Sequence, residues 1–98
     1  MRRPDHTETF SENEDIWAKP VLACYVHLHG GVWFVVEYDK NTDIGFGWAE
    51  VVPGCGELGS FSLLDLEDIS AGLAYTNKNV QHTLREAVNE YFTDQAVK

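Results

Sequence analysis

The chain has 98 residues, of which 44% are hydrophobic and 12% aromatic, so it is long enough for one globular domain and lies outside the disordered class. Its 16 acidic residues against 7 basic ones give a formal net charge of -9 at pH 7, which argues against direct binding to nucleic acid because such proteins present a basic face. No apolar run approaches the roughly 20 residues of a membrane-spanning helix. The start of the chain also lacks the apolar core of a secretory signal, so we expect a cytoplasmic protein that does not bind a membrane.

Residues 1–15 are predicted to form a flexible acidic tail. Between Pro4 and Ala18 there is no Lys or Arg, and apolar residues are sparse. The acidic residues of this stretch are Asp5, Glu8, Glu12, Glu14 and Asp15. Because like charges repel and there is little apolar surface to bury, such a segment is either flexible or lies on the surface of the folded domain. Residues 16–98 are then a single domain.

A β-hairpin is predicted next in the chain. Residues 21–29 alternate in the manner of a strand, and the face that carries Leu22, Cys24, Val26 and Leu28 is the better candidate for the core. The pair Gly30-Gly31 is typical of a tight turn, because glycine accepts a positive φ. Residues 32–38 are apolar on both faces, which indicates a central strand covered on both sides.

Two further strands are predicted over residues 44–52 and 57–61. In the first, Phe46, Trp48 and Glu50 alternate with Gly45, Gly47 and Ala49. Two glycines on one face leave either a shallow groove or room for a neighbouring side chain to lie against the backbone.

Two helices and a short extended piece near residues 73–75 complete the prediction. Ser62 is a suitable cap for a short helix over residues 63–69, and Asn77 or Asn79 for a longer one over residues 80–92. The longer helix has its apolar residues on one stripe, at Val80, Leu84, Ala87, Val88, Tyr91 and Phe92. We therefore expect an α+β fold, in which a C-terminal amphipathic helix packs on one face of a four-stranded antiparallel meander.

Several separated blocks of the sequence resemble a small family of unknown function. The blocks are Trp33, Glu37-Tyr38-Asp39, Phe46-Gly47, Glu57-Leu58-Gly59 and Phe61-Ser62-Leu63, with Leu66-Glu67 after them. Proteins of that family are often encoded on plasmids, conjugative elements and phages. The resemblance therefore implies a fold and an origin in a mobile genetic element, but no chemistry.

Signs of catalysis or of metal binding are weak. His27 and His29 lie two apart on a strand and so point to one face, where they are candidate ligands for a metal ion, but no third ligand lies nearby in the sequence. Glu37 follows five apolar residues and is either a buried carboxylate with a raised pKa or a solvated residue at a strand end. The cysteines Cys24 and Cys55 are expected to be reduced. No nucleophile or phosphate-binding motif is present, so we expect neither a cofactor nor an enzyme.

The strongest feature of the surface is its acidity. Between Asn41 and Asn77 there is no Lys or Arg, and six acidic residues are candidates for one partner-binding face: Asp43, Glu50, Glu57, Asp65, Glu67 and Asp68. Such a face either keeps the protein soluble or imitates the phosphates of a nucleic acid. The second reading predicts an inhibitor of a nucleic-acid-targeting defence system, such as a restriction or CRISPR complex, that blocks a basic site on its host partner.

An alternative reading places the binding site on aromatic side chains. Phe46 and Trp48, beside the groove at Gly45 and Gly47, would then form an apolar surface of a regulatory binding module. A third and weaker reading is a metal-assisted enzyme that uses His27 and His29.

Overall fold

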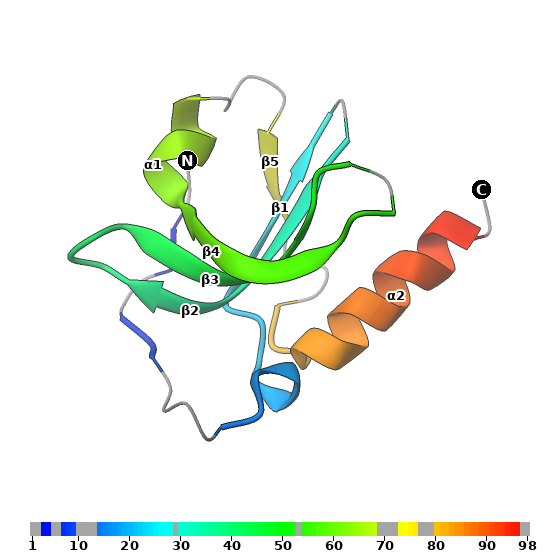
Figure 1. Cartoon of the computed structure of the whole chain (residues 1–98), viewed down its shortest axis with the longest axis horizontal. Helices are drawn as coiled ribbons and strands as arrows, with labels where there is room; N and C mark the ends of the chain where they lie inside the picture. The colour runs from blue at the N-terminus through cyan, green and yellow to red at the C-terminus, as the bar shows by residue number, and fades with distance from the viewer. Residues whose placement is uncertain are drawn as a thin grey trace.

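The computed structural model describes residues 3–4, 7–9, 14–28, 30–52, 54–68, 73–76 and 80–96. Its strands are β1 (Ala23–His27), β2 (Val32–Asp39), β3 (Ile44–Glu50), β4 (Glu57–Ser62) and β5 (Leu73–Thr76), and its helices are the 3-10 turn η1 (Ile16–Ala18), α1 (Leu63–Asp68) and α2 (Leu84–Ala96). The strands form one antiparallel sheet in the order β4-β3-β2-β1-β5 (Figure 1). The predicted α+β class and the four-stranded meander are confirmed. The extended piece predicted near residues 73–75 is a fifth strand beside β1.

The sheet has a hydrophobic core on each face, because α1 and α2 cover opposite sides of it (Figure 1). Residues Val32 to Val36 of β2 are all buried, which confirms the prediction of a central strand covered on both sides. The core under α2 and η1 contains Val21, Cys24, Val32, Phe34, Val36, Trp48, Leu84, Ala87 and Val88. The core under α1 contains Ala23, Tyr25, Trp33, Val35, Tyr38, Leu63 and Leu66.

The predicted inward face of β1 is wrong in part. Cys24 is buried, but Val26 is 36% exposed and Leu28 is 78% exposed. Ala23 and Tyr25, on the face expected to be the outer one, are fully buried. The reason is that the first half of β1 contributes side chains to both cores, Cys24 to one and Ala23 and Tyr25 to the other, whereas Val26 and Leu28 lie near the hairpin turn.

Each helix begins with a side-chain cap. Ser62 Oγ accepts a hydrogen bond from the Asp65 N–H at 3.3 Å, as predicted for α1. In α2 the cap is Thr83, whose Oγ1 accepts from the Glu86 N–H at 3.2 Å while Glu86 Oε1 accepts from the Thr83 N–H at 2.9 Å. The helix therefore begins at Leu84, four residues later than predicted, and the expected caps Asn77 and Asn79 lie outside the described residues.

Within the described ranges no helix combines the length and the apolar character that a bilayer crossing requires.

Candidate functional site

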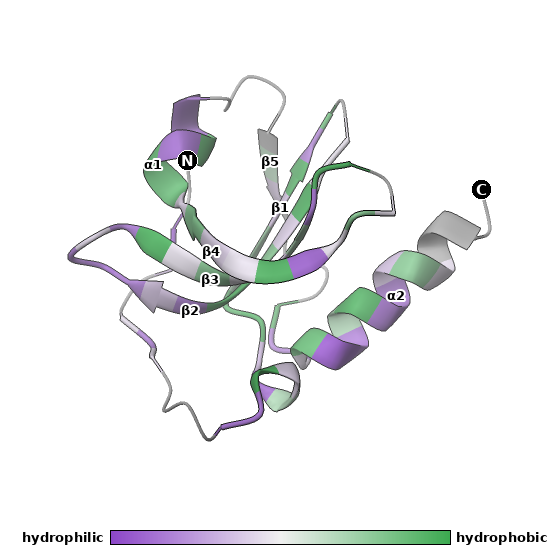
Figure 2. Ribbon diagram, viewed as in Figure 1, coloured by the Kyte–Doolittle hydropathy of each residue, from purple (hydrophilic) through white to green (hydrophobic). Residues whose placement is uncertain are grey.

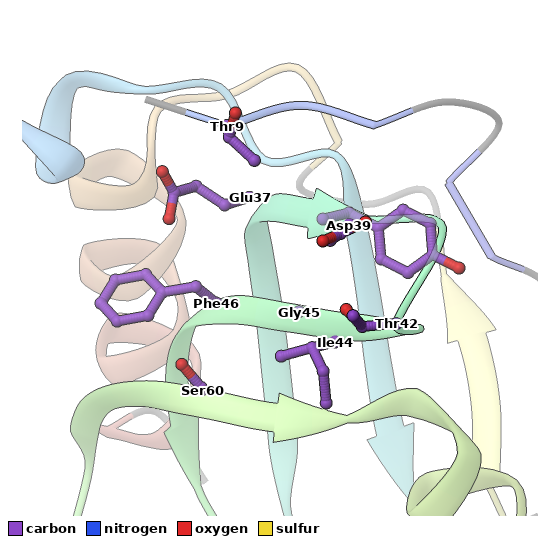
Figure 3. Close-up of a pocket in the computed structure, with 9 residues that line it drawn as sticks. Thr9, Glu37, Asp39, Thr42, Ile44, Gly45, Phe46 and Ser60 are labelled. Atoms are coloured by element: carbon purple, nitrogen blue, oxygen red, sulfur yellow. The ribbon is translucent and has the colours of Figure 1, made fainter. Parts of the chain in front are cut away.

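A cavity of about 260 Å³ lies over the end of β2 and the adjoining parts of β3 and β4 (Figure 3). Figure 3 shows Glu37, Phe46 and Ser60 in a row across three neighbouring strands, with Asp39 and Ile44 in a second row. The residues that line the cavity are Thr9, Glu37, Tyr38, Asp39, Thr42, Ile44, Gly45, Phe46 and Ser60. Because Phe46 and Trp48 are two apart on β3, the cavity lies on the same face as α2, on a part of the sheet beyond the core that contains Trp48.

A β-bulge turns Glu37 toward this cavity. The register between β2 and β3 shifts between Val35 and Glu37, so Val36 and Glu37 lie on the same face, whereas regular alternation would separate them. Glu37 is then paired with Phe46, which is paired in turn with Ser60 on β4. The sequence carries no clear signal for this bulge, and Glu37 is therefore a site residue that alternation alone does not place.

The N-terminal segment forms one wall of the cavity. Strand β1 pairs with β2 only as far as Val35, and Glu8 takes the next place through two backbone hydrogen bonds with Tyr38, at 2.8 and 2.9 Å. The side chain of Thr7 accepts a hydrogen bond from the Lys40 N–H at 3.0 Å. These contacts bring Thr9 to the cavity. The described residues of the segment thus make specific contacts, while the flexibility of residues 1–15 stays a prediction.

The lining suits a cationic group that lies against an aromatic ring. Glu37 and Asp39 supply carboxylates, Thr9, Thr42 and Ser60 are hydroxyl-bearing residues, and Phe46 supplies an aromatic ring. Pockets for drug-sized ligands usually measure ~300–1,000 Å³. A cavity of about 260 Å³ therefore fits a single side chain of a partner better than a large cofactor.

Of the alternative aromatic groove, the structure places Phe46 at this cavity and Trp48 in the core. Trp48 is 4% exposed, its ring stacks on Phe34, and it contacts Tyr91 and Phe92 edge-on. The space beside Gly45 is filled by Phe61 and Val35, which confirms that a neighbouring side chain lies against the glycine backbone. Of the two aromatic residues proposed for the groove, Phe46 therefore lines the cavity and Trp48 does not.

Two of the six candidate acidic residues are neutralised by an arginine from the N-terminal segment. Arg3 Nε donates to both oxygens of Asp43, at 2.9 and 3.1 Å, and its Nη2 donates to Glu67 Oε2 at 2.5 Å. The Tyr38 hydroxyl also donates to Asp43, at 2.6 Å. This cluster ties the start of the chain to β2, to the turn after it and to α1. Its sequence signal is Arg3 itself, a basic residue beside a stretch that is otherwise acidic.

The cluster shifts the pKa values of its members. Burial works to raise the pKa of Asp43, but the hydrogen bonds from Arg3 and Tyr38 outweigh this effect and lower it below its usual value. The hydrogen bond from Arg3 likewise lowers the pKa of Glu67. Burial, with the hydrogen bond to Asp43, raises the pKa of Tyr38 to about 12. All three shifts favour an intact ion-pair cluster at neutral pH.

Replacing Arg3 by methionine is expected to destabilise the protein at pH 7 and to have a smaller effect at pH 2.5. The carboxylate pKa values are lower in the folded state than in the unfolded one, so the stabilisation is present above about pH 4 and is lost as the pH falls through the lowered values. The Arg3–Asp43 pair is partly exposed, so we expect a loss of about 1 kcal/mol at pH 7. Urea unfolding at the two pH values measures this difference. Lys40→Met removes the same charge from an exposed position and is the control; an equal effect of both substitutions at pH 7 would contradict the assignment.

Glu50 lies away from the other acidic residues, within the core region under α2. It is 7% exposed, and its carboxylate accepts a hydrogen bond from the Tyr91 hydroxyl at 3.0 Å. Burial, together with the hydrogen bond to Glu50, raises the pKa of Tyr91. Glu50 is thus placed to fix α2 on the sheet, and the structure does not bring it to an exposed acidic face.

The remaining three acidic candidates are exposed. Asp65 and Asp68 lie on α1, and Glu57 begins β4, which leads into α1. Glu57 is paired with Ala49, which packs on the core under α1, so all three lie on the side of the sheet that α1 covers. Figure 2 shows hydrophilic residues both on α1 and at the start of β4. The six-residue strand, roughly 20 Å long, separates Glu57 from the two aspartates.

The candidate metal ligands and the cysteines are placed as follows. His27 ends β1 and is partly buried, whereas His29 lies outside the described residues, so their pairing stays a prediction. Among the residues that the structure describes, no group of three or more His, Cys, Asp or Glu is placed to hold a metal ion. Cys24 is buried, Cys55 is exposed, and neither forms a disulfide.

Comparison with known proteins places the chain in a family. The family model described as "Protein of unknown function (DUF2958)" matches residues 3–94, a much longer stretch than the blocks that carried the resemblance. Neither the curated proteins nor the solved structures contain a significant match. Because the family match covers nearly the whole chain, the resemblance to a family of unknown function is confirmed, and the chain belongs to the DUF2958 family.

Proposed function

We propose that this chain is a small acidic protein-interaction module without enzymatic activity, which docks on a basic surface of a partner protein. The observation that carries the proposal is the state of Glu57, Asp65 and Asp68. All three are exposed on one side of the sheet, and in the described part of the chain no basic side chain pairs with them. Carboxylates left uncompensated in this way attract a basic partner over a distance and at a high rate.

The specific form of the proposal is an inhibitor encoded on a mobile genetic element. It would act in the cytoplasm on a nucleic-acid-targeting defence system, a restriction or CRISPR complex, and occupy the basic site that otherwise receives nucleic acid. Two observations support this form. The net charge of -9 is large for 98 residues, and exposed carboxylates lie at both ends of the segment that runs from the start of β4 into α1.

Neutralising the three carboxylates is expected to abolish partner binding. We expect wild-type protein to capture a basic nucleic-acid-binding protein from a lysate of the source organism at low salt, and to release it as salt screens the attraction. The Glu57→Gln, Asp65→Asn, Asp68→Asn variant should lose at least 90% of this capture, as measured by quantitative mass spectrometry. For the inhibitor form, added duplex DNA or RNA should compete for the same partner.

The matched control changes the net charge by the same amount on the opposite side of the sheet. Glu14→Gln, Asp15→Asn and Glu90→Gln neutralise carboxylates that are already paired, with Lys19, Arg85 and His82, near η1 and α2. This control should bind like wild type. If the first variant binds as well as the control, the acidic surface serves only solubility and the proposal fails.

A second candidate function is a regulatory module that binds through the cavity at Phe46. The favouring observation is the cavity itself, about 260 Å³ in size, which is lined by the carboxylates of Glu37 and Asp39 and by the aromatic ring of Phe46. This binding would be lost when the Phe46 ring is removed and kept when Glu57, Asp65 and Asp68 are neutralised, which separates it from the first proposal.

A further inference from the structure

Strand β4 presents an open edge. It lies at one end of the strand order, and in the described part of the chain β3 is the strand that pairs with it. The Leu63 N–H donates to the Asp43 carbonyl at 3.0 Å, in register with the pair Ile44 and Ser62. Because hydrogen-bonded and non-hydrogen-bonded pairs alternate in an antiparallel ladder, the N–H and C=O groups of Leu58 and Ser60 and the N–H of Ser62 point away from β3, whereas the Ser62 carbonyl, at the N-cap of α1, accepts the first hydrogen bond of that helix. These three residues form the free edge.

This edge has few of the devices that usually prevent strand addition. Natural edge strands are protected by charged side chains, above all Lys, by Pro or by a bulge, and the charged residue of β4 is Glu57 at its first position. The sequence of β4, Glu57 to Ser62, contains neither Lys nor Pro, and its register with β3 is continuous. Leu58 and Ser60 are exposed, and among the described residues no strand other than β3 pairs with β4.

The charges near this edge indicate which kind of segment binds beside β4. Glu57 stands at its first residue, and Asp65 and Asp68 follow its last residue on α1. A second copy of the chain has the same net charge of -9 and is therefore disfavoured. A basic segment would be attracted.

The cavity provides a place for one side chain of such a segment. A strand added to β4 lies about 9.6 Å from β3, which is twice the usual spacing of strands. A long side chain of this strand, Arg or Lys, would pass over Ser60 toward the Phe46 ring and meet it as a cation–π pair, with the carboxylate of Glu37 beyond (Figure 3).

From these features we infer that a basic, extended segment of a partner protein binds beside β4 as a sixth strand of the sheet. Backbone hydrogen bonds to Leu58, Ser60 and Ser62 supply affinity, and a long basic side chain in the cavity at Phe46 supplies specificity. The inference rests on the proposed protein-binding function and names the form in which the partner is recognised.

The test uses a library of random linear nonapeptides, selected for binding to the whole folded protein. We expect the enriched peptides to carry Arg or Lys at alternate positions and to lack Pro in the centre. A selected peptide, made synthetically, should shift the amide signals of Leu58, Ser60 and Ser62 in NMR spectra and slow their hydrogen exchange.

Ser60→Pro removes one outward N–H without removing a bond to β3, and should weaken the peptide's Kd at least tenfold. Ser60→Thr keeps both the N–H and a hydroxyl group, so it is the matched control and should stay within about twofold of wild type. Thermal unfolding of each variant shows whether the fold is intact. If Ser60→Pro does not fold, hydrogen exchange in the wild-type complex decides the question.

Four results would overturn the inference. Three concern the peptides: no peptide is enriched, the enriched peptides are not basic, or a selected peptide binds Ser60→Pro and wild type equally well. The fourth is a dimer in sedimentation experiments that the Ser60→Pro substitution converts to a monomer. The last would assign the edge to a second copy of the chain. The variants also separate this inference from the proposed function. Suppose that a lysate partner no longer binds when Glu57, Asp65 and Asp68 are neutralised but still binds the Ser60→Pro variant. The proposed acidic docking surface would then be supported, and the inference of an added strand would be wrong.

Discussion

Replacing Gly47 by alanine is expected to lower the free energy of unfolding by about 3 kcal/mol, whereas the same change at Gly59 should shift it by less than ~1 kcal/mol. The two glycines face each other across β3 and β4. A methyl group at Gly47 would lie 1.8 Å from the carbonyl oxygen of Phe34, whereas one at Gly59 would meet nothing within 4 Å. The atom in the way at Gly47 belongs to the backbone of β2, so rotation of a side chain cannot relieve the overlap.

Gly59→Ala is therefore an internal control for strand propensity, because it adds the same methyl group to the neighbouring strand. Chemical unfolding in urea, with both variants in the same buffer, measures the difference. Equal stability of the two variants would show that the β2 backbone at Phe34 can move away from β3 to accommodate the methyl group. The close approach of the two strands would then not be a fixed feature of the sheet. The contrast also tests the neighbourhood of the bulge that turns Glu37 into the cavity.

Local patterns in the sequence were sufficient to predict most of the sheet. The hairpin follows from a run of β-branched and aromatic residues around Gly30 and Gly31, and both glycines have a positive φ. The cap at Ser62 follows from the spacing of a hydroxyl and an acidic residue. The start of α2 was predicted too early, because Val80 fits the apolar stripe although the capping residue is Thr83.

The features that the sequence did not reveal depend on contacts between distant segments. The stretch from Asn41 to Asn77 contains no basic residue, which predicts one continuous acidic face. Arg3 lies far away in sequence and compensates two of those acids, so it changes the face in a way that no local pattern shows. In the same way, alternation on β3 places Phe46 and Trp48 on one face of the sheet. It does not show which part of that face is covered by α2. One of them therefore lines a cavity while the other lies in the core.

That difference leads to the second large effect. Replacing Trp48 by alanine is expected to cost about 4 kcal/mol of folding free energy. The ring is 4% exposed, and its centroid lies 6.0 Å from that of Phe34, 5.8 Å from Tyr91 and 5.7 Å from Phe92. Domains of this size are stable by only ~5–15 kcal/mol. The variant should therefore show a much lower midpoint of thermal unfolding, and any loss of binding would follow from the loss of structure.

Phe46→Ala is the informative counterpart, because Phe46 is partly exposed and lines the cavity instead of the core. Its loss should cost no more than about 1.5 kcal/mol, since little of the ring is held by the core. Binding that disappears in Phe46→Ala while its unfolding midpoint stays close to wild type would place the partner at the cavity. A Trp48→Ala protein with an unchanged midpoint would contradict the aromatic core described above. Measured together, the two variants separate an aromatic side chain that binds a partner from one that holds α2 on the sheet.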